Sequence, residues 1–175
     1  GNGADEVAVG SQADCSIGTP CTNGGTFDDI NALLTVNGGG AGADGLVVIC
    51  ISSRISATHQ AAVLAAEQFR GGIPIRVIDS ALVSAALGLV AIEAAELAAT
   101  GVGIDPVEQI ARDAAAASNI YATLDTLEFL KRGGRIGGAQ AFVGNLLDIK
   151  PIISFKDGAV EPAARVRSRR KALAA

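Results

Sequence analysis

Residues 46–59 read Leu-Val-Val-Ile-Cys-Ile-Ser-Ser-Arg-Ile-Ser-Ala-Thr-His, and this stretch decides the fold. Its first six residues are all apolar and mostly β-branched, which is typical of a strand buried on both faces of a parallel sheet. Polar residues then mark the end of the strand, and apolar residues at helical spacing resume after Thr58. The pattern predicts a buried strand, a polar loop and a helix in succession.

The same alternation continues along the chain. Further strands are predicted at Ile75–Ile78 and Ile120–Leu124, with a hairpin of Ile152–Phe155 and Ala159–Val166 around the tight turn Asp157-Gly158. Helices are predicted at Thr58–Phe69, Ser84–Ala99, Pro106–Ala117 with Asp105 as its cap, and Thr126–Lys131. Strands that alternate with helices predict an α/β fold with a mainly parallel sheet and flanking helices.

The first 45 residues form a segment of different character, rich in glycine and poor in β-branched runs. We expect mostly loop there, with one helix at Thr26–Leu34 capped by Thr26 or Asp28. The sequence therefore suggests three parts: residues 1–45, an α/β domain at 46–150, and a hairpin with a basic tail at 151–175.

Composition excludes several classes of protein. With 175 residues and 49% hydrophobic content the chain is not disordered, and its net charge of −4 disfavours polyanion binding. The longest charge-free apolar stretch, Ala81–Ile92, is shorter than the roughly 20 residues of a bilayer span. No basic, apolar leader opens the chain, so we expect a cytoplasmic protein. One histidine and three cysteines without Cys-x-x-Cys spacing predict no metal site.

Charge is distributed unevenly. From Lys150 onward seven basic residues face two acidic ones, which leaves the remainder of the chain at −9. The basic stretch Arg165–Lys171 could belong to a DNA-binding regulator, but aromatic residues are only 3% of the chain, so a solvated or partner-facing surface is favoured. The glycine pattern at Gly40–Gly45 precedes a strand instead of following one, which argues against a dinucleotide site, and no P-loop is present.

The loop after the first buried strand carries four hydroxyl side chains, those of Ser52, Ser53, Ser56 and Thr58. Open α/β sheets bind ligands where their parallel strands end, and hydroxyls beside a helix N-terminus suit a carboxylate or phosphate oxygen. Alternatively, Ser56 and Thr58 only cap the helix. A serine-dependent acyl esterase is a further alternative, with His59 as the base, although no G-x-S-x-G elbow is present.

A second candidate site lies in residues 131–138, where three cations stand among four glycines. Glycine lets the backbone approach a ligand or partner closely, and Arg135 offers a planar guanidinium to a carboxylate. A solvated turn after a helix is the equally favoured alternative.

Three segments together resemble the DegV family. Residues 51–60 are similar to its I-S-S-x-L-S-G-T-Y-Q signature, and residues 77–80 followed by 87–89 to its V-I-D-S and G-L-G. Residues 125–136 and 144–152 resemble its D-T-L-E-Y-L-x-K-G-G-R-I and G-N-L-L-x-I-K-P-I stretches almost letter for letter. The resemblance covers roughly residues 19–173 and corresponds to a central portion of the two-domain family architecture, so we expect the tail to lead into a C-terminal part absent from this chain.

The resemblance implies a bacterial, non-enzymatic protein that binds one long-chain fatty acid, such as palmitate or oleate, in an apolar tunnel. It also implies that the fatty acid is presented to a dihydroxyacetone-kinase-like fatty acid kinase, which phosphorylates the carboxyl group, with exchange of fatty acid at the membrane surface. No cofactor is implied. The alanine-rich stretch 84–99 leaves space for such a ligand, or else allows close helix packing.

The resemblance also assigns residues. Ser56 and Thr58 match the serine and threonine beside the carboxylate, and Thr19 matches a further threonine of the head-group site. Arg135 and Arg167 match arginines linked to the head-group network or to the kinase contact.

Overall fold

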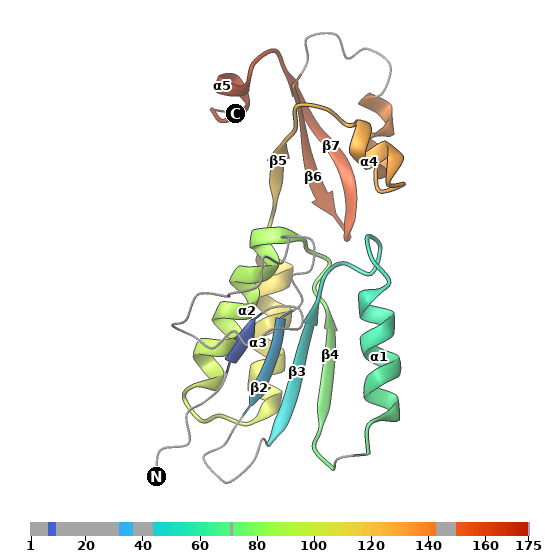
Figure 1. The fold of residues 1–175 in the computed structure, drawn as a ribbon. Coiled ribbons are helices and arrows are strands. Elements are labelled where there is room, and N and C mark those ends of the chain that lie inside the picture. The colour runs from blue at the N-terminus through green and yellow to red at the C-terminus, as the bar shows by residue number, and fades with distance from the viewer. Residues whose placement is uncertain (1–6, 10–31, 37–43, 71, 143–149, 175) are drawn as a thin grey trace. The chain divides into compact units, whose positions relative to one another are not determined.

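The computed structural model describes residues 7–9, 32–36, 44–70, 72–142 and 150–174. The chain divides into two compact units, Gly1–Ser118 and Asn119–Ala175, whose elements are drawn in Figure 1. The division between Ser118 and Asn119 differs from the boundaries suggested at residues 45 and 150.

The first unit contains a four-stranded sheet in the order β1-β2-β3-β4. Its strands are β1 (Val7–Val9), β2 (Ala32–Val36), β3 (Gly45–Cys50) and β4 (Ile75–Asp79). The predicted parallel pairing is present between β3 and β4, while β1 with β2 and β2 with β3 are antiparallel. Helices connect and flank this sheet, so the α/β class predicted from the sequence is confirmed.

The start of the chain departs from prediction. Ala32, Leu33 and Leu34 belong to β2 and not to the helix expected at Thr26–Leu34, whose other residues lie outside the described part. The sequence Ala-Leu-Leu-Thr-Val suits either structure, and pairing with β3 along the whole length of β2 decides for the strand.

The described residues of the first unit form three helices: α1 (Thr58–Gln68), α2 (Ser84–Ala98) and α3 (Ile104–Ala117). The helices cover both faces of the sheet. Successive residues of β4 point to opposite faces, and Arg76 contacts α3 while Ile75 and Val77 line a groove with α1. Figure 1 shows α1 beside β4, with α2 and α3 toward β2 and β3.

Small side chains let α2 pack closely. Its buried residues are five alanines with Leu87 and Val90, and it packs against α3, where Val107 and Ala111 are buried. The alanines of α2 are thus buried in a close helix–helix contact, which favours close packing as their role. By contrast, α1 has no buried residue.

Close approach also explains Gly45. A Cβ built on this residue would lie 2.6 Å from Cδ1 of Ile104, the first residue of α3. The helix begins two residues earlier than predicted, with Gly103 at the N-cap position and no side-chain cap, so Asp105 is not the cap. Asp105 lies in the first turn, where its carboxylate faces Arg76 of β4.

The second unit is built on a three-stranded antiparallel sheet in the order β5-β6-β7. Its elements are β5 (Tyr121–Thr123), α4 (Glu128–Arg132), the 3-10 helix η2 (Gly137–Phe142), β6 (Lys150–Lys156), β7 (Ala159–Val166) and α5 (Arg169–Ala172). The predicted hairpin is confirmed: Asp157 and Gly158 both have positive φ, 50° and 77°, as its two-residue turn requires.

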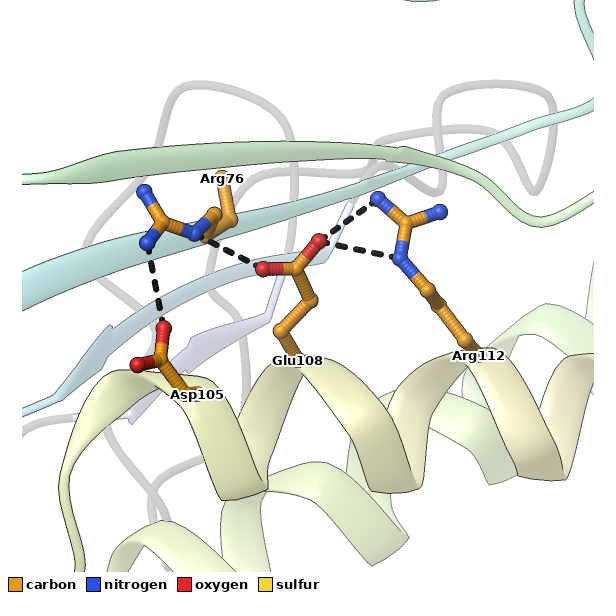
Figure 2. A network of polar contacts seen from close by, with 4 residues as sticks. All are labelled: Arg76, Asp105, Glu108 and Arg112. Atoms are coloured by element: carbon orange, nitrogen blue, oxygen red, sulfur yellow. Dashed lines mark hydrogen bonds and ion pairs between the residues drawn. The ribbon is translucent and has the colours of Figure 1, made fainter.

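An ion-pair network joins α3 to β4 (Figure 2). Arg76 contacts Asp105 at 3.0 Å and Glu108 at 2.7 Å, and Glu108 also pairs with Arg112 at 2.7 Å. Only 21% of the Glu108 side chain is exposed, so its carboxylate interacts with both guanidinium groups where solvent screens them less.

Replacing this central carboxylate tests the network. Glu108→Gln should lower the free energy of unfolding by about 1 kcal/mol, because two charge-assisted contacts are lost at a partly buried position. The measurement is urea unfolding at low and high salt. Glu128→Gln is the matched control, since its pair with Arg132 is exposed on both sides and should contribute less than about 0.5 kcal/mol. Equal losses in the two variants would contradict the prediction.

Candidate functional site

The site is built from two loops that follow neighbouring parallel strands. Residues 51–57 follow β3 and residues 80–83 follow β4, and the register pairs Cys50 with Asp79 at the ends of the two strands. Hydrogen bonds continue beyond the sheet, from Ser52 N to Leu82 O at 2.9 Å and from Ser80 N to Cys50 O at 3.2 Å. The two loops are therefore bound side by side.

Asp79 and Ser80 hold the loops together with their side chains. Asp79 Oδ1 accepts the backbone N–H of Ser53 at 3.1 Å and that of Ala81 at 3.0 Å. Buried Ser80 donates its hydroxyl to Cys50 O at 2.7 Å and accepts the N–H of Leu82 at 3.1 Å. Ala81 has φ of 54°, a left-handed conformation that these contacts on either side maintain.

The electrostatics of Asp79 follow from these contacts. Burial alone would raise the pKa of its carboxyl group, but hydrogen bonds from the Ser53 side chain and from the Ala81 and Ser53 N–H groups, with the nearby His59, lower it below its ordinary value. Burial raises the pKa of the neighbouring Cys50 thiol to about 11, with a contribution from the charge of Asp79. The aspartate is thus kept ionised and the thiol protonated.

A hydroxyl pair is formed by Ser56 and Thr58. These are the two residues that the sequence predicts to bind a carboxylate. Their Oγ and Oγ1 atoms are 2.7 Å apart, and Ser56 Oγ also accepts the N–H of Thr58 at 3.3 Å. Both side chains are partly exposed. Their mutual bond uses one of the two hydroxyl hydrogens, and within the described residues no contact takes the other. The pair can therefore donate one hydrogen bond to a ligand oxygen.

Two alternatives were stated for this loop, helix capping and a serine esterase. Ala57 occupies the N-cap position of α1 and makes no side-chain cap, while Ser56 Oγ accepts the N–H of Thr58, the first residue of the helix, so Ser56 also serves the helix start. A serine esterase would require a hydrogen bond between Ser56 and His59. Among the described contacts, Ser56 is hydrogen-bonded to Thr58 and not to His59.

The two remaining serines of the loop, Ser52 and Ser53, form hydrogen bonds within the protein. Ser52 is fully buried; its Oγ accepts the N–H of Arg54 at 3.2 Å, and its carbonyl accepts those of Ile55 and Ser56. Ser53 is exposed, and its side chain hydrogen-bonds to Asp79. Ser52 therefore shapes the turn that leads to Ser56.

The proposed arginines belong to the second unit. Exposed Arg135 follows a turn in which Gly134 has φ of 71°, and it donates from Nη1 to Gly133 O at 2.6 Å. Exposed Arg167 follows β7. Nearby in sequence, Arg165 stacks over Phe142 and donates to Ala141 O. Thr19 lies outside the described residues, so its assignment stays a prediction.

An apolar groove lies on the α1 side of the sheet. It measures about 340 Å³ and is lined by Val63, Ala66, Glu67, Phe69, Ile73, Ile75 and Val77. These residues come from the second half of α1, from the segment that connects it to β4, and from β4 itself, whereas Ser56 and Thr58 lie at the helix start. The groove and the hydroxyl pair share no lining residue.

The described ranges lack two further features. No group of three or more histidine, cysteine, aspartate or glutamate side chains there could hold a metal ion. Nor does that part of the chain contain a helix with the length and apolar character needed to cross a bilayer.

Comparison with known proteins gives the family. A model described as an uncharacterised protein of the DegV family matches residues 20–175. The chain belongs to the DegV family. The resemblance recognised in its loops is thereby confirmed over most of the sequence.

Relatives and solved structures agree with this assignment. A DegV domain-containing protein of Streptomyces coelicolor is 42% identical over 134 residues, which are 77% of this chain and 47% of the relative. A solved fatty-acid-binding DegV family protein from Thermus thermophilus is 40% identical with a TM-score of 0.68, covering 74% of this chain and 46% of its own. DegV from Bacillus subtilis, described as a fatty acid binding protein, is 34% identical with a TM-score of 0.64, covering 75% and 47%. The chain thus spans about half the length of the relatives it matches.

The role of Asp79 and Ser80 was not predicted from the sequence. Both residues were part of the family signature, but no function was attached to them. A signal was present, because Asp79 ends β4 and Ser80 follows it, close to where Ser52 and Ser53 follow β3, and the ends of adjacent parallel strands lie together.

The pKa of Asp79 predicts how acid affects stability. Because its pKa is lower in the folded state than the ordinary value of 3.8, its ionised form stabilises the fold above about pH 4. This contribution is lost as pH falls through the folded-state pKa. Wild type should therefore exceed Asp79→Asn in free energy of unfolding at neutral pH, and the difference should shrink below about pH 4.

Chemical denaturation between pH 2.5 and 7 measures this difference. Glu96→Gln, at an exposed position of α2, controls for the removal of one negative charge from the same unit. A difference between wild type and Asp79→Asn that is constant across the range would contradict the assignment.

Proposed function

We propose that this protein binds one long-chain fatty acid and holds its carboxylate at the Ser56–Thr58 hydroxyl pair. The observation that carries the proposal is the spare hydroxyl hydrogen of this pair at the start of α1. Membership in a family whose solved members from Thermus thermophilus and Bacillus subtilis are described as fatty-acid-binding supports the choice of ligand.

The physical chemistry of the loop suits a carboxylate. The N-terminus of α1 carries the positive end of the helix dipole, and a hydroxyl that donates to a charged oxygen contributes about 1.5–3 kcal/mol. Most of the affinity must come from the acyl chain, since burial of about 16 carbons at about 0.8 kcal/mol per CH₂ supplies about 12 kcal/mol before ordering costs. The hydroxyl pair then fixes the orientation of the ligand.

The proposal extends to a partner. We infer that the protein acts without catalysis of its own, as a cytoplasmic carrier that presents the carboxyl group to a fatty acid kinase. Residues 119–175 contain ten basic and five acidic residues, and Arg135 and Arg167 are exposed there, so an acidic surface of a kinase would be attracted. Thr19 and Arg135 are proposed to assist at the carboxylate.

Native mass spectrometry with added oleate tests the binding role. One oleate per chain is expected for wild type, and Ser56→Ala with Thr58→Val should weaken binding about 10- to 100-fold, because a hydrogen bond to a charged group is lost. Thr100→Val is the control, since its hydroxyl donates to Leu97 O at the end of α2, far along the chain from the loop.

Two outcomes would count against the proposal. Wild-type protein that stays free of ligand with excess oleate would overturn the binding role. Unchanged affinity in the double variant would leave fatty acid binding standing but remove the head group from Ser56 and Thr58.

A further inference from the structure

We infer that Asp79 is a positioning residue for the hydroxyl pair: by accepting hydrogen bonds from both loops, it holds Ser56 in place for a ligand carboxylate. This inference rests on the proposed function for the identity of the ligand. The contact geometry that supports it stands within the first unit.

The connection from Asp79 to Ser56 is short and continuous. Asp79 Oδ1 accepts the N–H of Ser53, which fixes the residue that follows Ser52. The carbonyl of Ser52 then accepts the N–H groups of Ile55 and Ser56, at 3.0 and 3.1 Å. Ser56 in turn places its Oγ 2.7 Å from Thr58 Oγ1. Each step is a hydrogen bond or a peptide bond, so displacement at Ser53 reaches the hydroxyl pair.

Asp79 acts from a firmly held position. It is the last residue of β4 and is paired with Cys50 in the parallel register. The next residue, Ser80, is buried, and its hydroxyl donates a hydrogen bond to Cys50 O and accepts one from Leu82 N–H. The same Oδ1 atom also binds the N–H of Ala81, at the residue with positive φ. One carboxylate oxygen therefore ties the loop after β3 to the strand and turn of β4.

A carboxylate suits this role better than a neutral acceptor. Hydrogen bonds to an ionised acceptor are roughly twice as strong as those between neutral groups. Asparagine keeps one acceptor oxygen but lacks the charge, whereas alanine removes the acceptor. The order of the loop should therefore fall from wild type to Asp79→Asn to Asp79→Ala.

A double-mutant cycle separates positioning from general loss of stability. Asp79→Ala is expected to weaken oleate binding about 10-fold in the wild-type background and less than 2-fold in the Ser56→Ala background, because its effect passes through Ser56. Asp79→Asn should restore most of the affinity. Asp105→Ala, which removes a carboxylate of the same unit that pairs with Arg76, should leave affinity unchanged.

Equal losses in the two backgrounds would overturn the inference, because a merely structural effect does not depend on Ser56. Unchanged affinity in Asp79→Ala, while Ser56→Ala weakens binding, would overturn it as well and leave the proposed function intact.

Hydrogen exchange of the free protein tests the same inference without ligand. The amides of residues 53–56 should exchange fastest in Asp79→Ala, at an intermediate rate in Asp79→Asn and slowest in wild type, while amides of α3 are unaffected. If Asp79→Ala does not fold, the exchange rates of wild type and Asp79→Asn are compared instead. Identical exchange would overturn the inference. If exchange follows the expected order but the protein does not bind oleate, the positioning role of Asp79 is confirmed and only the identity of the ligand is rejected.

Discussion

Everything at the candidate site depends on the parallel pairing of β3 with β4. The register that sets Leu46 opposite Ile75 also sets Cys50 opposite Asp79, so both strands end at the same level. A shift by one residue would turn Ile49 and Ile78 away from the helices that cover them and separate the two loops. The complete burial of Val47, Ile49 and Cys50 is what makes such a shift costly.

The polar contacts of the first unit divide into two kinds. The network of Arg76, Glu108 and Arg112 fastens α3 to the sheet with partly exposed charges. At the opposite end of β4, Asp79 and Ser80 satisfy backbone N–H and C=O groups that the turns leave unpaired. The first kind adds stability in small amounts, while the second determines the shape of the loops, because buried backbone groups tolerate few alternative arrangements.

Much of this architecture could be predicted from the sequence. The apolar run before Ser52 and the Asp157-Gly158 turn each have one physical solution, a doubly covered strand and a tight hairpin. The strand at Ala32–Val36 could not be predicted, since its residues suit a helix equally and only its partners in the sheet decide. The role of Asp79 was hidden for a similar reason: besides the Ser53 side chain, its partners are the backbone N–H groups of Ser53 and Ala81, whose direction a sequence does not record.

Helix α1 has no buried residue, whereas seven residues of α2 are buried. An 11-residue helix is near the limit of stability without tertiary packing, so α1 opens locally more readily than the core around it. Thr58 is its first residue, and a carboxylate bound there would stabilise the helix from its N-terminal end. Part of the intrinsic binding energy would then be consumed in ordering the helix, and release of such a ligand would be coupled to fraying of α1.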